Sequence, residues 1–279
     1  MTDILREYFG WTQTRPVEGW FSWQHLLYVT LMVILTVTLG IILGRRRRFA
    51  DEKKRRRVLQ VAALLMIGLE LFKIVLCSFR SHDVWAFRGF LPLFLCSILL
   101  LSLPIAAFGH GRISRAATDF SFCFGMLCCI AGTYLAGNIF GGSPVLSFDP
   151  MVSVTTHCIS GFATVYIGVS GLAEMKPRNI PVSFAILAVF EGLALAADIW
   201  QKPTPYQSNY MFFMTPDGTP FQICLDIVGG NQVLYTAFVM LLYFVYLALF
   251  YAGYTVVKRC LAARRAKKIE KTIASSASL

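Results

Sequence analysis

The stretch GRRRRFADEKKRRR, residues 44–57, decides how this chain folds, because it places nine lysines and arginines between two long apolar segments. An α-helix rises 1.5 Å per residue, so about 20 apolar residues cross a hydrocarbon layer of about 30 Å. Helices satisfy their own backbone groups within such a layer. We therefore expect seven transmembrane helices, at Leu26–Gly44, Val58–Phe79, Phe90–Phe108, Phe120–Phe140, Met151–Leu172, Ile180–Ile199 and Val233–Val257.

The composition supports an all-α membrane bundle. The chain of 279 residues is 56% hydrophobic, and its mean hydropathy is +0.62. The segments are apolar on all faces, whereas the helices of a soluble protein carry an apolar stripe. The longest other stretch, residues 201–232, is rich in proline and aromatic residues and reads as a loop. We predict one integral membrane domain over residues 1–279.

The basic residues predict the topology, because they fall in alternate gaps between the segments. Residues 109–119 hold two, residues 173–179 hold two and the tail from residue 258 holds seven, so these gaps and residues 45–57 contain twenty of the 26 lysines and arginines. Alternate gaps share one side of a membrane, and the positive-inside rule assigns that side to the cytoplasm. We expect an outer N-terminus, a cytoplasmic C-terminus and a bacterial plasma-membrane location.

The net charge of +11 invites a nucleic-acid interpretation, which the positions of the charges disfavour. Basic clusters beside spans set topology and attract anionic lipid head groups. The expected partners are membrane lipids, with anionic head groups at the cytoplasmic basic loops and no nucleic acid. The sequence leaves the oligomeric state open.

The cysteines do not form a metal-binding pattern. Six of the eight lie within predicted spans, and no CxxC pair stands with a second pair or with histidine ligands. Buried cysteine usually behaves as a small apolar residue. We expect no metal and no cofactor.

Charged residues inside spans are costly and usually face a bundle interior or a wet cavity. Glu70 and Lys73 are three residues apart, so they can meet on one helix face. Their pairing fits either a packing role or a functional site. Glu191 and Asp198 are seven apart and also share a face.

The predicted topology converts sequence position into depth. Cys96 and His157 both lie about 9 Å below the outer surface, and Lys73 and Glu70 lie at about 9 and 14 Å. His25 precedes the first span, and Asn209 and Tyr210 lie in the last outer loop. These groups share the outer third of the bilayer, which predicts one polar cavity that opens outward.

A thiol and a histidine at equal depth form a candidate catalytic pair. A neutral imidazole can accept the proton of Cys96, and the thiolate then attacks a carbonyl. Glu70 is the candidate third member that would orient His157. Cys158 and Ser97 are alternative nucleophiles, and a membrane histidine that only bridges helices is the structural alternative.

Four motifs follow one another in order: FSWQHLL (21–27), LPLFLCS (91–97), VTTHCIS (154–160) and SNYMFF (208–213). Together they resemble the YwaF-like integral membrane family, which includes the eukaryotic transmembrane protein 164. The resemblance implies a seven-span helical fold and, for the eukaryotic branch, phospholipid acyl transfer through a membrane cysteine. The positions that match the motifs are His25, Cys96, His157, Asn209 and Tyr210.

The chain departs from the family pattern at two places. Phe94 stands where the third-span motif often has a histidine, which removes a possible second base beside Cys96. Residues 228–235 read VGGNQVLY where the family often has a GPWPxY stretch. The first departure weakens the catalytic interpretation, and the second affects how the outer loop would seal the cavity.

Two functions from different classes remain open. The first is a lipid acyltransferase or acyl hydrolase, with Cys96 as nucleophile, His157 as base and Glu70 with Lys73 polarising the site. His25, Asn209 and Tyr210 would line its mouth. The alternative is a transporter or ligand-binding membrane protein with an outward-facing polar cavity. Against a transporter, the sequence shows no inverted repeat and no pair of Gly/Pro-broken helices in corresponding positions.

Overall fold

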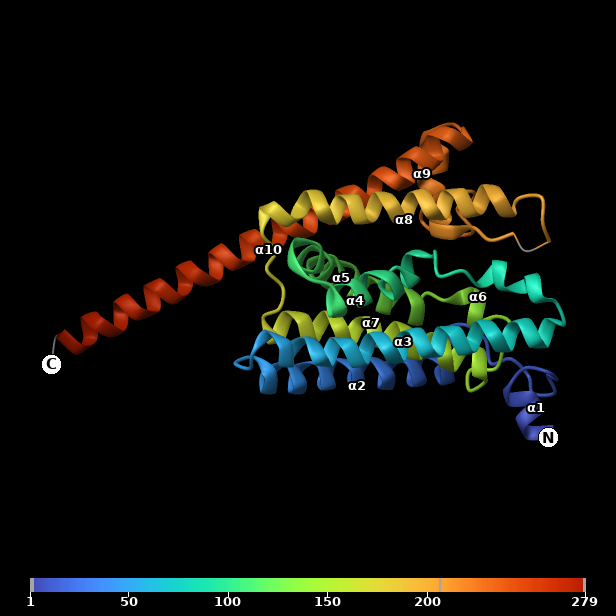
Figure 1. The fold of residues 1–279 in the computed structure, drawn as a ribbon, viewed down its shortest axis with the longest axis horizontal. Helices are drawn as coiled ribbons and strands as arrows, with labels where there is room; N and C mark the ends of the chain where they lie inside the picture. The colour runs from blue at the N-terminus through green and yellow to red at the C-terminus, as the bar shows by residue number, and fades with distance from the viewer. Residues whose placement is uncertain (1–2, 206, 278–279) are drawn as a thin grey trace.

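The computed structural model describes residues 3–205 and 207–277, without the side chains of residues 96, 138, 265 and 268–277. The described chain is helical and contains no strand. Figure 1 shows α8 and α10 on one side of the bundle, α2, α3 and α7 on the other, and α4 and α5 between them. The remaining elements are short: α1 (Asp3–Tyr8), α6 (Gly137–Phe140), α9 (Gln222–Ile227), η1 (Val84–Phe90), η2 (Leu95–Ser97), η3 (Pro177–Asn179) and η4 (Tyr210–Phe212).

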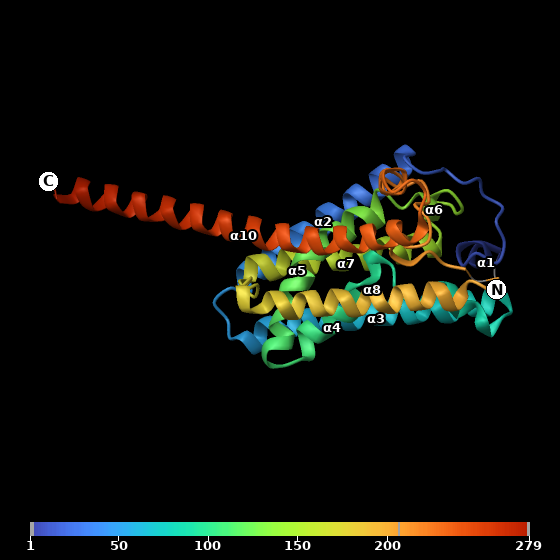
Figure 2. The same ribbon diagram turned by 90° about the horizontal axis from the view of Figure 1, so that it is seen from above.

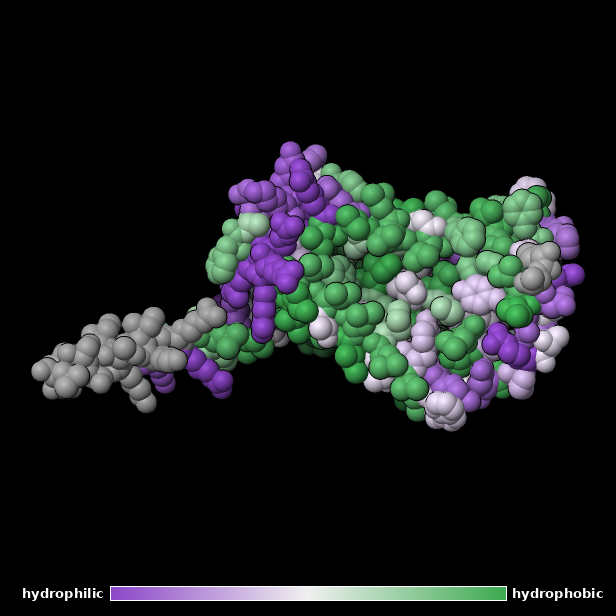
Figure 3. All heavy atoms as spheres, turned by 90° about the horizontal axis from the view of Figure 1, so that it is seen from below, coloured by the Kyte–Doolittle hydropathy of each residue, from purple (hydrophilic) through white to green (hydrophobic). Residues whose placement is uncertain are grey.

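Six helices in the described part of the chain are long and apolar enough to cross a membrane. Their exposed apolar side chains form a broad belt between more polar ends (Figure 3). This is the surface that a protein presents to lipid. The spanning helices are α2 (Trp23–Arg47), α3 (Glu52–Ser81), α5 (Gly111–Thr133), α7 (Phe148–Ser170), α8 (Ile180–Gln201) and α10 (Gln232–Ala277).

The predicted span Phe90–Phe108 is not one continuous helix, so the prediction of seven spanning helices is confirmed only in part. The chain is irregular after η1, makes the short η2 turn, and becomes α-helical only in α4 (Leu99–Phe108). Pro92 explains the break, because proline has no amide hydrogen and disfavours helix at the preceding residue. Leu91 accordingly has an extended backbone, with φ −61° and ψ 140°.

The connections that carry the basic gaps lie at one end of the bundle, which we call the basic end (Figure 1). Arg55 of α3 donates to the carbonyls of Ser170 and Gly171, which close α7. Arg56 donates to the carbonyl of Ala106 in α4. Cations near helix C-termini are favourable because the last carbonyls carry partial negative charge. Helix α1 lies at the opposite end (Figures 1 and 2), which we call the N-terminal end.

A buried carboxylate, which the sequence reasoning did not single out, organises the basic end. Asp119 of α5 is fully buried. It accepts hydrogen bonds from the backbone amides of Glu174 and Met175 at 2.9 Å and from the Asn179 side chain at 2.8 Å. These bonds satisfy the charge and fix the connection from α7 to α8.

The α5–α7 contact depends on glycines. A methyl group at Gly125 of α5 would overlap the Thr164 hydroxyl, and at Gly161 of α7 it would meet Cys129 Sγ at 2.7 Å. Gly40 of α2 likewise lies against Val165 of α7. Small residues let membrane helices approach closely, and the resulting van der Waals contacts stabilise the association of the helices.

We expect Gly125→Ala to destabilise the protein by about 1–3 kcal/mol, because backbone and side chains of α7 must shift to admit the methyl group. Thermal and denaturant unfolding in one detergent would measure the change. Gly192→Ala is the matched control, since Gly192 lies inside α8 and the described atoms leave open space around its Cα. It should be neutral or stabilising by up to about 1 kcal/mol. Equal effects of the two substitutions would contradict the close α5–α7 approach.

Candidate functional site

A small cavity of about 20 Å³ lies where α3, α7 and the η2–α4 segment meet. A cavity of this size holds about one water molecule. Its lining combines charged, hydroxyl and imidazole groups with two apolar side chains. The lining residues are Met66, Glu70, Lys73, Ser97, Leu100, Thr156, His157 and Ser160.

Glu70 and Lys73 form the predicted ion pair, with Lys73 Nζ 2.6 Å from Glu70 Oε1. The Glu70 side chain is 7% exposed and the Lys73 side chain 21%. The cost of burying either charge alone is large, and the partner offsets part of it. The structure therefore confirms the contact and places it in the same cavity as His157.

His157 is buried and its ring is oriented by its own helix. Nδ1 lies 2.6 Å from the Ser153 carbonyl oxygen. A carbonyl can only accept, so Nδ1 carries the hydrogen, and in the neutral ring Nε2 then has the lone pair. The carbonyl of Ser153, rather than Glu70, thus sets the tautomer.

Gly132 of α5 makes room for this imidazole. A methyl group at Gly132 would overlap Cδ2 and Nε2 of His157. The position of the ring is thus fixed from two sides, by a hydrogen bond within α7 and by the backbone of α5. Sequence spacing alone does not reveal the second contact.

Cys96 lies in the η2 turn, and its side chain is outside the described atoms. Its neighbour Ser97 lines the cavity. The preceding carbonyl, that of Leu95, accepts a hydrogen bond from Cys128 Sγ of α5 at 3.2 Å. The structure therefore places the turn that carries Cys96 at the cavity wall.

His25 lies elsewhere and is fully buried. Its Nδ1 accepts from the Phe21 amide at 3.2 Å, so its Nε2 donates to the Thr133 carbonyl at 3.0 Å. Its ring packs against Phe140 in a tilted arrangement, with centroids 4.1 Å apart and 48° between the ring planes. These contacts tie the start of α2 to the end of α5, and His25 is not among the residues that line the cavity.

Tyr210 and Asn209 organise the loop after α8. Tyr210 OH donates to the Arg88 carbonyl at 2.7 Å and accepts from the Leu91 amide at 3.1 Å. Burial raises the pKa of the Tyr210 phenol, which keeps this donor protonated. Asn209 bonds within the loop, to Thr215 and Asp217. Tyr210 therefore stabilises the broken segment before Cys96, whereas Asn209 shapes the loop itself.

Three consecutive carbonyls of the same loop are held by α10. Met211 and Phe212 have left-handed backbones, with φ of 53° and 60°. Tyr243, Tyr235 and Thr236 donate to the carbonyls of residues 211, 212 and 213 respectively. Such strained conformations persist where surrounding contacts overdetermine them.

The other acidic and thiol candidates lie apart from the cavity lining. Glu191 is fully buried, and neither carboxylate oxygen has a hydrogen-bond partner among the described residues. Asp198 accepts from the Tyr210 amide at 2.9 Å. Cys158 packs in a separate apolar cluster with Val29 and Cys129.

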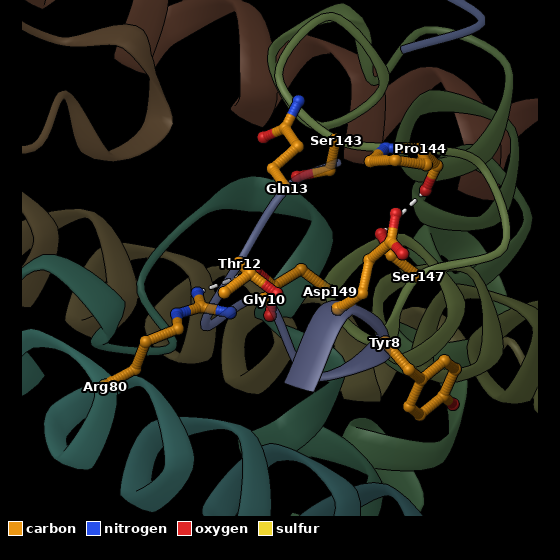
Figure 4. Close-up of a pocket in the computed structure, with 10 residues that line it drawn as sticks. Tyr8, Gly10, Thr12, Gln13, Arg80, Ser143, Pro144, Ser147 and Asp149 are labelled. Atoms are coloured by element: carbon orange, nitrogen blue, oxygen red, sulfur yellow. Dashed lines mark hydrogen bonds and ion pairs between the residues drawn. The ribbon is translucent and has the colours of Figure 1, made fainter. Parts of the chain in front are cut away.

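A second, larger cavity of about 230 Å³ opens at the N-terminal end (Figure 4). Arg80 of α3 and Asp149 of α7 meet there, with 2.7 Å between Nη2 and Oδ2. Glu7 completes the charged lining, and hydrogen bonds from the Thr14 side chain and from Arg15 hold the pKa of its carboxyl below the usual range. The sequence reasoning missed Arg80 and Asp149, although Arg80 is two helical turns beyond Lys73.

We expect Glu70→Gln to destabilise the protein by about 3–5 kcal/mol, because it leaves the Lys73 ammonium without a counter-charge. Unfolding of the single and double variants would form a double-mutant cycle, in which Glu70→Gln/Lys73→Met should recover much of the loss. Asp51→Asn is the control, since the exposed Asp51–Lys54 pair has the same spacing at the start of the same helix, where the Asp51 side chain makes no cap hydrogen bond. It should cost at most about 1 kcal/mol. A Glu70→Gln effect as small as the control would refute a buried pair.

Comparison with protein families gives one match, to the TMEM164 family model over residues 20–253. Comparison with curated proteins and with solved structures gives no match. The matched region contains the first spanning helix, the broken third segment, the cavity and the loop that Tyr210 anchors. The chain is a membrane protein that belongs to the TMEM164 family.

Proposed function

We propose that this protein transfers or releases acyl groups of membrane lipids through a cysteine–histidine site in the cavity. The observation that carries the proposal is the state of His157. Its ring is buried, held in the Nδ1–H tautomer, and placed in the cavity beside the turn that contains Cys96. The family resemblance supplies the substrate class, an ester-linked phospholipid.

The chemistry follows from these groups. His157 Nε2 accepts the Cys96 proton, and the thiolate attacks the ester carbonyl of a phospholipid. The carbon–oxygen bond breaks, the released lysolipid oxygen takes the proton from His157, and the acyl chain remains on sulfur as a thioester. A second lysolipid reverses these steps as acyl acceptor. Transfer therefore needs no cofactor and conserves one acyl group.

The charged pair has a supporting role in this proposal. Lys73 and Glu70 share the cavity with His157 and place opposite charges beside the reacting atoms. An ammonium that is already in place beside a developing oxyanion stabilises it. Glu70 in turn holds the Lys73 side chain in place, with 2.6 Å between Nζ and Oε1.

We expect Cys96→Ser and His157→Ala each to reduce acyl transfer by at least about a hundredfold, the range typical of losing a nucleophile or a general base. The assay follows a labelled acyl chain between phospholipids with purified protein in mixed micelles. Cys123→Ala is the control, because Cys123 is buried on α5 and does not line the cavity. Full activity in both test variants would refute the proposal.

Gly132→Ala tests whether the position of His157 matters. The added methyl group would push the imidazole from its place, so we expect a drop in kcat of about tenfold to a hundredfold. Gly192→Ala, in open space on α8, should retain the activity of the unmodified protein. Unfolding midpoints of both variants would separate a displaced ring from a loss of fold. Unchanged kcat in folded Gly132→Ala would mean that His157 is not the base.

A further inference from the structure

The α3–α7 contact carries polar residues along its whole length toward the N-terminal end. At the inner limit Ser160 Oγ donates to Met66 Sδ at 3.6 Å. Glu70, Lys73 and His157 follow in the small cavity, and Arg80 with Asp149 closes the series. Between these levels lie Cys77 of α3 and Ser153 of α7, and Arg80 Nη2 is 3.6 Å from Cys77 Sγ.

The spacing of these residues is helical on both sides. Residues 149, 153 and 157 recur every four positions on α7, and residues 70, 73, 77 and 80 recur every three or four on α3. Eight residues separate Asp149 from His157, which corresponds to about 12 Å along the helix. The two cavities therefore lie at two levels of a single helix–helix contact.

Several features of this contact indicate water. The larger cavity is lined mostly by polar groups and opens to solution at the N-terminal end. Asp149 Oδ1 is buried there without a hydrogen-bond partner among the described residues. The inner cavity has room for one water and offers hydroxyl, ammonium, carboxylate and imidazole groups, and polar cavities of this kind are hydrated.

We propose that the two cavities are the ends of one hydrated seam between α3 and α7, which admits water and small polar solutes from the N-terminal side to His157. The seam is defined by residues 70, 73, 77 and 80 of α3 and residues 149, 153 and 157 of α7. Ser153 marks its midpoint, because its hydroxyl is 3.4 Å from His157 Nδ1 and one turn from Asp149.

A strap formed by residues 3–22 forms part of the wall at the mouth of this seam. Arg80 donates to the Phe9 carbonyl at 3.1 Å, Glu18 accepts from the Val145 amide at 2.8 Å, and Trp20 donates to the Tyr134 carbonyl at 2.8 Å. Glu7, Thr12 and Gln13 of the strap line the larger cavity. Most of the strap precedes the family match, which begins at residue 20.

The seam has a chemical consequence that rests on the proposed acyl transfer. Water at His157 gives up a proton to Nε2 while its oxygen adds to the Cys96 thioester carbonyl. The carbon–sulfur bond then breaks, a fatty acid leaves, and the proton on Nε2 passes to the sulfur. One water is consumed without an oxidant or a reductant, so the site is a lipid acyl hydrolase whenever no acceptor lipid is bound.

Thiol labelling tests the seam without requiring turnover. Ser153→Cys and Val154→Cys proteins in nanodiscs would be treated with a small cationic methanethiosulfonate, and modification at each cysteine would be followed by peptide mass spectrometry. Val154 is the matched control, since it is the next residue on α7 and is fully buried in the apolar cluster with Val29. We expect Ser153→Cys to react at least about tenfold faster. Equal rates would overturn the proposal.

A plug tests the route. Thr12→Trp, combined with Ser153→Cys, places an aromatic ring in the larger cavity and should slow labelling about tenfold. Pro16→Trp on the same exposed strap is the control, because residue 16 does not line that cavity. If Thr12→Trp leaves the labelling rate unchanged, the reagent does not enter through this cavity and the proposed route is overturned.

The hydrolysis consequence has its own readout. In ¹⁸O-water without acceptor lipid, the fatty acid released should contain ¹⁸O, and Thr12→Trp should lower that release relative to Pro16→Trp. Absence of both acyl transfer and acyl release in the unmodified protein would refute the proposed function, while the labelling result would still decide the seam. Transfer without ¹⁸O release would overturn the hydrolysis.

Discussion

Backbone amides and carbonyls that are shielded from water need partners within the protein, and side chains supply several of them in the irregular stretch from η1 to α4. Tyr210 bonds both the Arg88 carbonyl and the Leu91 amide, Gln201 donates to the same Arg88 carbonyl, and Cys128 donates to the Leu95 carbonyl. Non-helical backbone at membrane depth is tolerated where protein surrounds it. The η2 turn that carries Cys96 exists because the loop after α8 and helix α5 satisfy its surroundings.

The loop itself depends on α10. Its strained backbone at Met211 and Phe212 is held by tyrosines of that helix, and the loop in turn presents Tyr210 to the broken segment. The site is thus supported by a chain of contacts from α10 through the loop to η2. This arrangement explains how Tyr210 can support the site without lining the cavity: it acts on the backbone that precedes the turn with Cys96, whereas Asn209 shapes the loop that holds Tyr210.

The other half of the site depends on close packing. Gly132 and Gly125 let α5 approach α7 closely, so the backbone at Gly132 packs on the imidazole of His157, which the Ser153 carbonyl orients. The charged pair on α3 completes the cavity from the opposite side. Each charge is buried enough to need the other, and both partners lie on α3, three residues apart.

Much of the fold was predictable because its causes are local. Apolar length predicts the spanning helices, alternate basic gaps predict their common end, and a spacing of three residues predicts the contact of Glu70 with Lys73. Pro92 also carried a local signal for the break in the third segment, which apolar length alone concealed.

The sequence by itself therefore determined the membrane class, the common end of the basic gaps and the ion pair, since each depends on residues close together in the chain. Only the tertiary structure decided that Gly132 packs on His157, that His25 bonds to α5 away from the cavity, and that Arg80 meets Asp149 beside the strap. These contacts join residues about 25 to more than 100 positions apart. These contacts depend on how each helix is rotated and how far it is shifted along its neighbours. Close packing across the whole bundle sets both, and no short stretch of sequence specifies them.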